Sequence, residues 1–186
     1  MSSPSGRLVA SALAALLVCA PASLAQDVTE ASLKSAFIYN IASFAAWPGE
    51  TLPANGAFVA CVVGDSAVGP ALERAVKGRM LAGRAVNVVR VARQSPVPSC
   101  HLLYISDISA DQGRKIVAGL QGAPVLTIVE IDGFAMPGSV ARMFVEHGKL
   151  RFEIDYGLAK HSGLQLSSRL LALASRVYDG TATVTR

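Results

Sequence analysis

Apolar positions recur every three to four residues early in the chain, which is the period of an α-helix. Residues 33–48 read LKSAFIYNIASFAAWP and hold four of the chain's aromatic side chains. Asp27 is expected to cap this helix with Glu30 as its reciprocal partner, and Pro48 is expected to end it. The residues that share one helical face are Leu33, Phe37, Asn40, Ile41, Phe44 and Trp47.

Asn40 lies in the middle of this otherwise apolar face. A buried amide needs hydrogen-bond partners, so we expect Asn40 to fix how the helix docks. Two interpretations stay open. Either the face packs on its own domain, or part of the aromatic surface receives a partner, with Tyr39 pointing outward.

Beyond this helix, short apolar runs alternate with helical segments. The runs at 58–63, 85–91, 100–105 and 124–129 are typical of buried strands, and 67–77 and a segment from Asp107 or Ser109 to Leu120 are predicted helices. This alternation predicts an α/β fold with a mainly parallel sheet of about four strands, in the order second, first, third, fourth. Helices are expected on both faces.

The pattern changes in the last third of the chain. Residues 140–145 and 150–154 flank His147-Gly148-Lys149, which predicts a C-terminal antiparallel hairpin. Residues 166–178 are predicted to close the fold as a helix, and 180–186 to form a frayed tail. With no repeats and no internal boundary, residues 26–179 are expected to form a single domain.

Residues 1–25 have the features of a secretory signal. Arg7 supplies the positive start, the apolar run from 8 to 20 is too short to span a membrane comfortably, and Ser23-Leu24-Ala25 fits a cleavage site after Ala25. The net charge of +4 is mild and scattered, and the basic stretch from Arg84 to Arg93 has apolar residues between its charges. We therefore expect an exported, soluble protein that does not bind nucleic acid.

Two cysteines, Cys61 and Cys100, remain after residue 25. An even number in an exported chain favours a disulfide, and two buried free thiols are the alternative. The first and third predicted strands are neighbours in the expected order, which allows a bridge between them. Cys100 lies at the start of its predicted strand, where the backbone can adjust.

Motifs that carry chemistry are nearly absent. GDSAVG at residues 64–69 lacks the Lys-Ser/Thr of a phosphate loop, and no nucleophile elbow or zinc-protease motif occurs. The histidines, His101, His147 and His161, are isolated from one another and are expected to be packing or surface residues. Cys100 and His101 should point to opposite faces of their strand, which argues against a thiol–imidazole pair. The sequence predicts no catalytic residue, no metal site, no cofactor and no enzymatic activity.

Two polar features remain as candidates for a ligand pocket. A long loop at residues 131–138 follows the fourth predicted strand, at the sheet edge where α/β proteins often bind ligands. Arg151, Glu153 and Asp155 alternate along the last strand, which is typical of a solvated edge. Phe134, Arg151 and Glu153 would line a pocket if the protein senses a small molecule.

The chain resembles the YfiR family of exported bacterial regulators. The resemblance rests on the segment at 33–48, CVVGD from Cys61, CHLLYIS from Cys100, PVLTIVEIDGFA from Pro124 and LRFEIDYGLAKHSGLQLSSRLLALA from Leu150. It implies an α/β domain in the periplasm and a shared disulfide that maps onto Cys61 and Cys100. A second disulfide found in some relatives has no counterpart here.

The resemblance also implies a function. Family members repress an inner-membrane diguanylate cyclase by binding its periplasmic sensory region, and an outer-membrane lipoprotein relieves that repression. We expect the partner-binding surface to comprise exposed parts of six apolar residues, namely Phe37, Tyr39, Phe44, Trp47, Leu164 and Leu166. The alternative function is a small-molecule-binding periplasmic sensor module. The apolar excess also leaves a homodimer open.

Overall fold

The computed structural model describes residues 29–52, 55–65, 67–133, 138–180 and 182–184. Most of its strands form a 9-stranded sheet in the order β11-β10-β8-β7-β6-β5-β2-β4-β3. The strands of this sheet are β2 Phe58–Val63, β3 Met80–Leu81, β4 Arg84–Val91, β5 Leu102–Ser106, β6 Leu126–Glu130, β7 Ala141–Glu146, β8 Lys149–Asp155, β10 Arg176–Asp179 and β11 Ala182–Val184.

The parallel part of the sheet has the predicted order. Strand β2 pairs in parallel with β4 on one side and with β5 on the other, and β5 pairs in parallel with β6. The expectation of about four strands is too low, because β7 joins the other side of β6 in parallel and extends the sheet. The hairpin of β7 and β8 is antiparallel as predicted, with His147 and Gly148 at positive φ in its two-residue turn.

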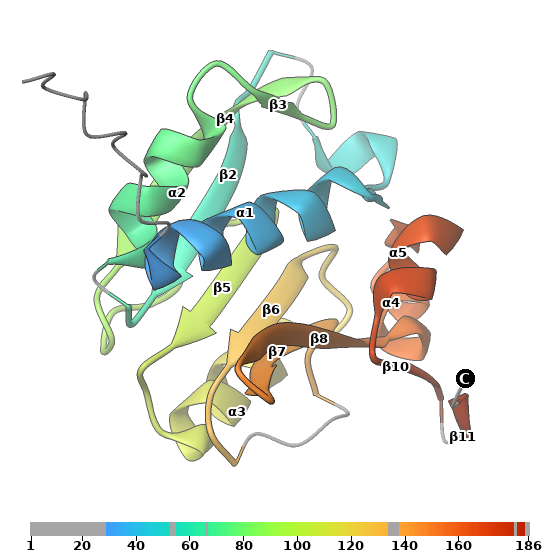
Figure 1. The fold of residues 1–186 in the computed structure, drawn as a ribbon. Coiled ribbons are helices and arrows are strands. Elements are labelled where there is room, and N and C mark those ends of the chain that lie inside the picture. The colour runs from blue at the N-terminus through green and yellow to red at the C-terminus, as the bar shows by residue number, and fades with distance from the viewer. Residues whose placement is uncertain (1–28, 53–54, 66, 134–137, 181, 185–186) are drawn as a thin grey trace, which may run out of the picture.

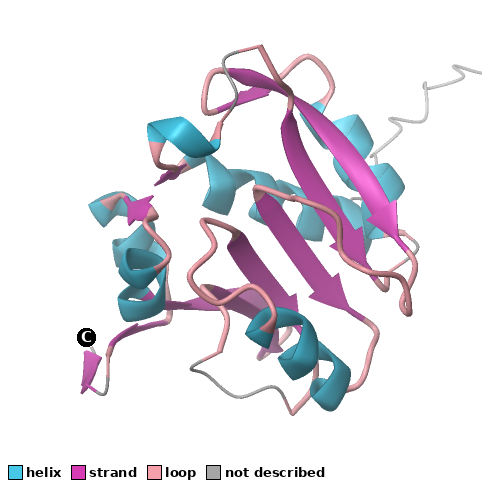
Figure 2. Ribbon diagram, turned by 180° about the vertical axis from the view of Figure 1, so that it is seen from behind, coloured by secondary structure: helices cyan, strands magenta, loops and turns pink. Residues whose placement is uncertain are grey.

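Helices cover both faces of the parallel strands, as predicted (Figures 1 and 2). One apolar core lies between the sheet and helices α1 and α2, and a second lies between the other face of the sheet and α3. Thr29 caps α1 through its side chain, and Ser109 forms a capping box with Gln112 at the start of α3. The helices are α1 Glu30–Ser43, α2 Val68–Val76, α3 Ala110–Ala118, α4 Tyr156–His161 and α5 Ser168–Leu173.

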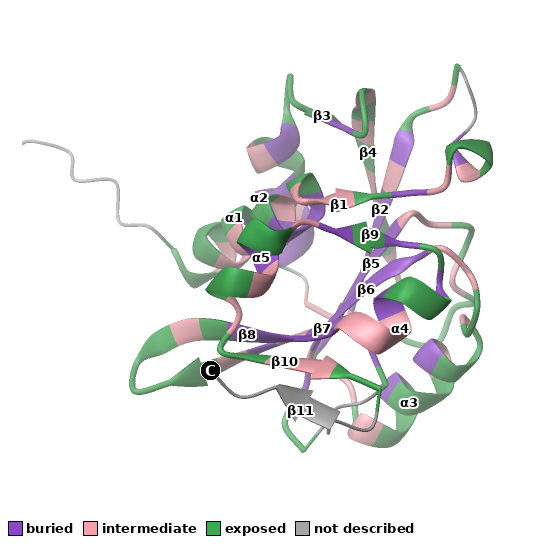
Figure 3. Ribbon diagram, turned by 90° about the vertical axis from the view of Figure 1, so that its right-hand side faces the viewer, coloured by how far each residue is buried: buried purple, intermediate pink, exposed green. Residues whose placement is uncertain are grey.

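The first helix ends earlier than the sequence predicts. It stops at Ser43, and Ala45–Ala46 form strand β1, which pairs antiparallel with β9, Gln165–Leu166 (Figure 3). The backbone N–H of Ser167 also donates to the carbonyl of Phe44, at 3.0 Å. The pairing of β1 with β9, which lies about 120 residues later in the chain, therefore ends the helix before Pro48. The sequence around the helix end could not show this, because the partner strand is distant in sequence.

The predicted helix at residues 166–178 is also wrong. Only Ser168–Leu173 is helical, and Arg176–Asp179 forms β10, which pairs in parallel with β8. Because β10 covers the outer side of β8, that strand is not an edge, and Glu153 and Asp155 are buried and not solvated. Three residues of the expected frayed tail, Ala182–Val184, form β11 and pair with β10.

Candidate partner-binding groove

A groove of about 230 Å³ opens where α1, β8 and α5 meet. Its floor and walls are almost entirely apolar, with one amide and one guanidinium among the lining side chains. The lining residues are Phe37, Asn40, Ile41, Phe44, Leu150, Arg151, Phe152, Leu170 and Leu173.

Aromatic rings form the contact across the groove. The rings of Phe37 on α1 and Phe152 on β8 meet edge to face, with centroids 6.4 Å apart. Such a pair holds two elements together and still leaves ring surface for a ligand. Leu173 of the groove lining is 66% exposed, and Leu33, four residues before Phe37 on α1, is 41% exposed. Exposed leucines beside an apolar groove are typical of a surface that receives another molecule.

The groove exists because α1 docks through a different face from the one predicted. The residues of α1 that are buried against the domain are Ser35, Ile38, Ile41 and Ala42. Asn40 is exposed, so the expectation that its buried amide fixes the docking is wrong. The small side chains of Ser35 and Ala42 let the helix approach α2 and the sheet closely, and the Ser35 hydroxyl donates to the carbonyl of Ala31 at 2.7 Å. The rings of Phe37 and Phe44 are left at the groove.

A cluster of ion pairs, partly shielded from solvent, anchors the N-terminal part of α1. The Lys34 ammonium lies 2.7 Å from Glu30 and 2.8 Å from Glu130 of β6, and the Tyr104 hydroxyl donates to Glu130 at 2.6 Å. Burial alone would lower the pKa of Lys34, but the two carboxylates outweigh it and raise the pKa above its usual value. The pKa of the Tyr104 hydroxyl is raised mainly by its burial and secondly by the negative charge of Glu130. Lys34 is therefore a permanent cation that ties α1 to β6.

The six residues expected at the partner surface divide into three groups. Phe37 and Phe44 line the groove, together with Arg151 from the expected ligand pocket. Trp47, Leu164 and Leu166 are buried in the core of the domain, so they cannot belong to an exposed surface. Tyr39 lies on another flank of α1, where its hydroxyl donates to the carbonyl of Met80 at 3.4 Å.

The described residues of the expected ligand pocket, Arg151 and Glu153, lie in different surroundings. Phe134 lies outside the described residues. The Glu153 carboxylate is buried in the sheet, where it pairs with Arg142 at 2.6 Å and with Arg176 at 3.5 Å and accepts from the Tyr178 hydroxyl at 3.2 Å. Of the two described residues, Arg151 lines the groove and Glu153 does not.

The sequence missed the wall that β8 supplies. Leu150 and Phe152 line the groove from alternate positions of this strand. Their spacing of two residues places them on one face of a strand. The spacing could have indicated that Leu150 and Phe152 share one face of β8. It could not show that this face lies beside α1.

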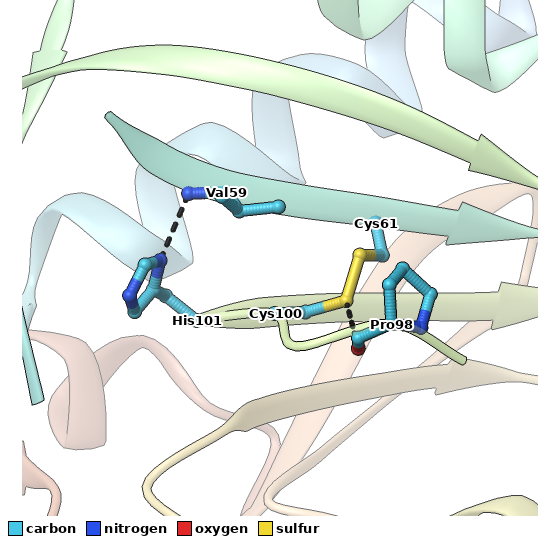
Figure 4. The surroundings of a disulfide bond; sticks show 5 residues. All are labelled: Val59, Cys61, Pro98, Cys100 and His101. Atoms are coloured by element: carbon cyan, nitrogen blue, oxygen red, sulfur yellow. Dashed lines mark hydrogen bonds between the residues drawn. A yellow bond between two sulfur atoms is a disulfide. The ribbon is translucent and has the colours of Figure 1, made fainter. Parts of the chain in front are cut away.

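The predicted disulfide joins Cys61 of β2 to Cys100, just before β5, with Cα atoms 6.0 Å apart (Figure 4). The Cys100 sulfur lies 3.1 Å from the carbonyl oxygen of Pro98. This is a contact and not a hydrogen bond, because a disulfide sulfur carries no proton. The side chain of His101 points away from Cys100, as predicted for adjacent positions, so the two do not form a catalytic pair.

His101 has a packing role with defined hydrogen bonds. Its Nδ1 accepts from the backbone N–H of Val59 at 2.9 Å, and its Nε2 lies 3.3 Å from the carbonyl of Thr51. This arrangement requires the neutral ring with the proton on Nε2. The carbonyl of His101 accepts from Trp47 Nε1 at 3.0 Å, and the Trp47 ring stands edge-on to Phe58. Burial lowers the pKa of His101, the hydrogen bond to Thr51 opposes this, and the Arg84 charge lowers it further.

Among the described residues, no group of three or more His, Cys, Asp or Glu side chains is placed to hold a metal ion. No helix within the described ranges has both the length and the apolar character needed to cross a membrane.

Residues 31–175 match the sequence profile of the family described as YfiR/HmsC-like. The match spans well over half of the 186 residues, so the chain belongs to this family. Membership of this family suggests a periplasmic regulator of a diguanylate cyclase. The resemblance found in the sequence is thereby confirmed. The matched range includes all the residues of α1, β8 and α5 that line the groove.

Proposed function

We propose that this protein represses an inner-membrane diguanylate cyclase by binding its periplasmic sensory region through the groove between α1, β8 and α5. Family membership supports the class of partner. The observation that carries the proposed site is the joining of Phe37, Phe44, Phe152 and the exposed Leu173 in one apolar groove. Aromatic side chains in well-packed grooves supply most of the binding free energy in many interfaces.

Repression would act by mass action. A regulator that binds only the inactive form of the sensory region shifts the cyclase by its difference in affinity for the two forms. Moving an equilibrium from 1:99 to 99:1 takes about 5.5 kcal/mol of such a difference. Two or three hot-spot side chains, each contributing at least about 2 kcal/mol, are of the right size for this. The groove offers that many aromatic and leucine side chains.

The test is the substitution Leu173→Glu, with Met80→Glu as its matched control. Leu173 is 66% exposed at the groove and Met80 is 65% exposed near the opposite end of the sheet, so neither change disturbs the core. The ligand is the purified periplasmic region of an inner-membrane diguanylate cyclase from the same bacterium. We expect Leu173→Glu to weaken binding at least about thirtyfold, because it places a carboxylate in an apolar contact. Met80→Glu should bind as the unmodified protein does.

Isothermal titration calorimetry measures the affinities, and the cellular concentration of cyclic di-GMP reports repression of the cyclase. Cells carrying Leu173→Glu should show raised cyclic di-GMP, and cells carrying Met80→Glu should not. Equal affinities for the two variants, with both folded by circular dichroism, would overturn the groove as the binding site. Absence of binding by the unmodified protein would overturn the proposed partner.

A further inference from the structure

Strand β4 carries a row of backbone groups that nothing in the described part of the chain pairs. Along residues 86–91 it pairs with β2 on one side. On its other side β3 pairs only with Ala85 and Arg84. In a parallel pair, every second residue directs its N–H and C=O away from the neighbour. Beyond β3, this edge of the sheet therefore offers donors and acceptors to an added strand.

The side chains of this edge are half-covered on both faces. Val86 and Val88 pack against the core beneath α1 and α2, and Val89 and Val91 pack against the core on the α3 face. All four are only partly buried, in contrast to residues 60–63 of the neighbouring β2, which are buried. A further strand alongside β4 would complete the burial of these valines on both faces at once.

A depression of about 580 Å³ lies along the same edge, between α2 and strands β3 and β4. Val86 and Val88 supply apolar lining, and Lys77 and Arg79 supply two cations against the single carboxylate of Glu73. An added strand could place every second side chain in this depression. Apolar and acidic side chains would match its lining.

The charges of β4 also decide what kind of strand fits. Residues 84–93 read RAVNVVRVAR, with arginines at 84, 90 and 93 and no carboxylate in the segment itself. Arg90 lies 3.5 Å from Glu73 of α2 and Arg93 lies 4.0 Å from Asp107, both in exposed pairs. A second copy paired through its own β4 would bring the same arginines, and no carboxylate of that strand, to this edge. Like charges directly opposite each other destabilise a sheet. The pattern therefore disfavours a second copy of this chain and favours a strand that alternates apolar and acidic residues.

We propose that β4 accepts an extended, acidic segment of another polypeptide as an added strand. Strand addition of this kind takes affinity from main-chain hydrogen bonds and selectivity from alternate side chains. The site is independent of the groove, because β4 and β8 lie toward opposite ends of the sheet order. The protein can therefore hold two partners at the same time.

The probe is a capped eight-residue peptide that alternates valine and glutamate, compared with one that alternates valine and lysine. Titrations followed by backbone amide NMR should show selective shifts for residues 86–91, and hydrogen exchange of those amides should slow. We expect the glutamate peptide to bind at least about tenfold more tightly than the lysine peptide, a difference that higher salt reduces. A glutamate peptide with alternate backbone nitrogens methylated should not bind, because it cannot complete the ladder.

Two matched substitutions separate this edge from the groove. Asn87 lies exposed on β4 and Asn40 lies exposed at the groove, so Asn87→Glu and Asn40→Glu make the same chemical change at the two sites. Asn87→Glu should weaken the glutamate peptide about tenfold or more by charge repulsion, and Asn40→Glu should leave it unchanged. The proposal would be overturned if the glutamate and lysine peptides bound equally tightly, or if the methylated peptide bound. It would also be overturned if the unmodified protein self-associated and Asn87→Glu removed that self-association.

Discussion

The two halves of the sheet are held together by different means. The parallel half, β4-β2-β5-β6, has an apolar interior and a disulfide between β2 and the chain just before β5. The C-terminal half, β7-β8-β10, has short flanking helices and depends on the buried carboxylates of Glu153 and Asp155. Glu153 joins three strands through Arg142, Arg176 and Tyr178, and Asp155 caps α4 by accepting from the N–H of Leu158.

The groove lies where these two halves meet. Its α1 wall belongs to the parallel half, since Lys34 pairs with Glu130 of β6 and Ile38 packs over the same core. Its other walls, β8 and α5, belong to the C-terminal half. The groove therefore keeps its shape only while both halves keep their own supports. One half is fixed covalently, and the other by polar contacts that a single substitution can remove.

The largest expected effect is loss of the covalent support. Replacing both cysteines, Cys61→Ala with Cys100→Ala, should lower the free energy of unfolding by about 4 kcal/mol, because the bridge closes a loop with a sequence separation of 39. Urea unfolding of the oxidised protein and the double variant measures this. Adding reductant should lower the stability of the unmodified protein and leave the variant unaffected. A loss below about 1 kcal/mol would show that the disulfide does not support the parallel half.

The next effect is loss of the buried carboxylate in the other half. Glu153→Gln should lower the free energy of unfolding by about 3 kcal/mol, because Arg142 is left without a buried counter-ion. The matched control is Asp179→Asn, which breaks the exposed pair with Lys160 and should leave the free energy of unfolding almost unchanged. Urea unfolding monitors both. If the two variants are equally stable, polar contacts do not hold the C-terminal half in place.

The smallest expected effect is a dependence of folding stability on pH, which His101 of the parallel half causes. Because the folded-state pKa of His101 is lowered from 6.5, the unfolded chain binds the proton first as pH falls. The neutral His101 ring therefore contributes its full stabilisation of the fold above pH 6.5. This stabilisation is lost as the pH falls from 6.5 toward the lower folded-state pKa. His101→Asn keeps an acceptor for the Val59 N–H without a titrating group.

Melting temperatures at pH 7.5 and pH 5 test this expectation. The unmodified protein should lose more stability over this interval than His101→Asn does. His161→Asn, at an exposed position at the end of α4, is the control and should follow the unmodified protein. Identical pH profiles for all three proteins would remove His101 as the cause.

The parallel half and the β7–β8 turn could be located from the sequence, whereas the strand β10 that follows α5 could not. Residues 58–63 and the hairpin turn at His147-Gly148 were predicted because their patterns are local, namely a short apolar run and a two-residue turn. The segment at 166–178 was predicted as one helix because leucines recur at helical spacing. Pairing of Arg176–Asp179 with β8 overrides that spacing. The same pairing buries Glu153, whose alternation with Arg151 and Asp155 indicated an exposed edge.

The sequence by itself determined the α/β class, the order of the parallel strands, the cysteine pair and the family. These follow from local period, from the count of cysteines and from motifs in a fixed order. Only the tertiary structure decided which face of α1 is buried, because Phe37 and Ile38 are both apolar and the choice depends on the small side chains of Ser35 and Ala42. It also decided that β8 lies inside the sheet and β4 near its edge. Neighbours far apart in sequence set these outcomes, and they create both the groove and the open edge.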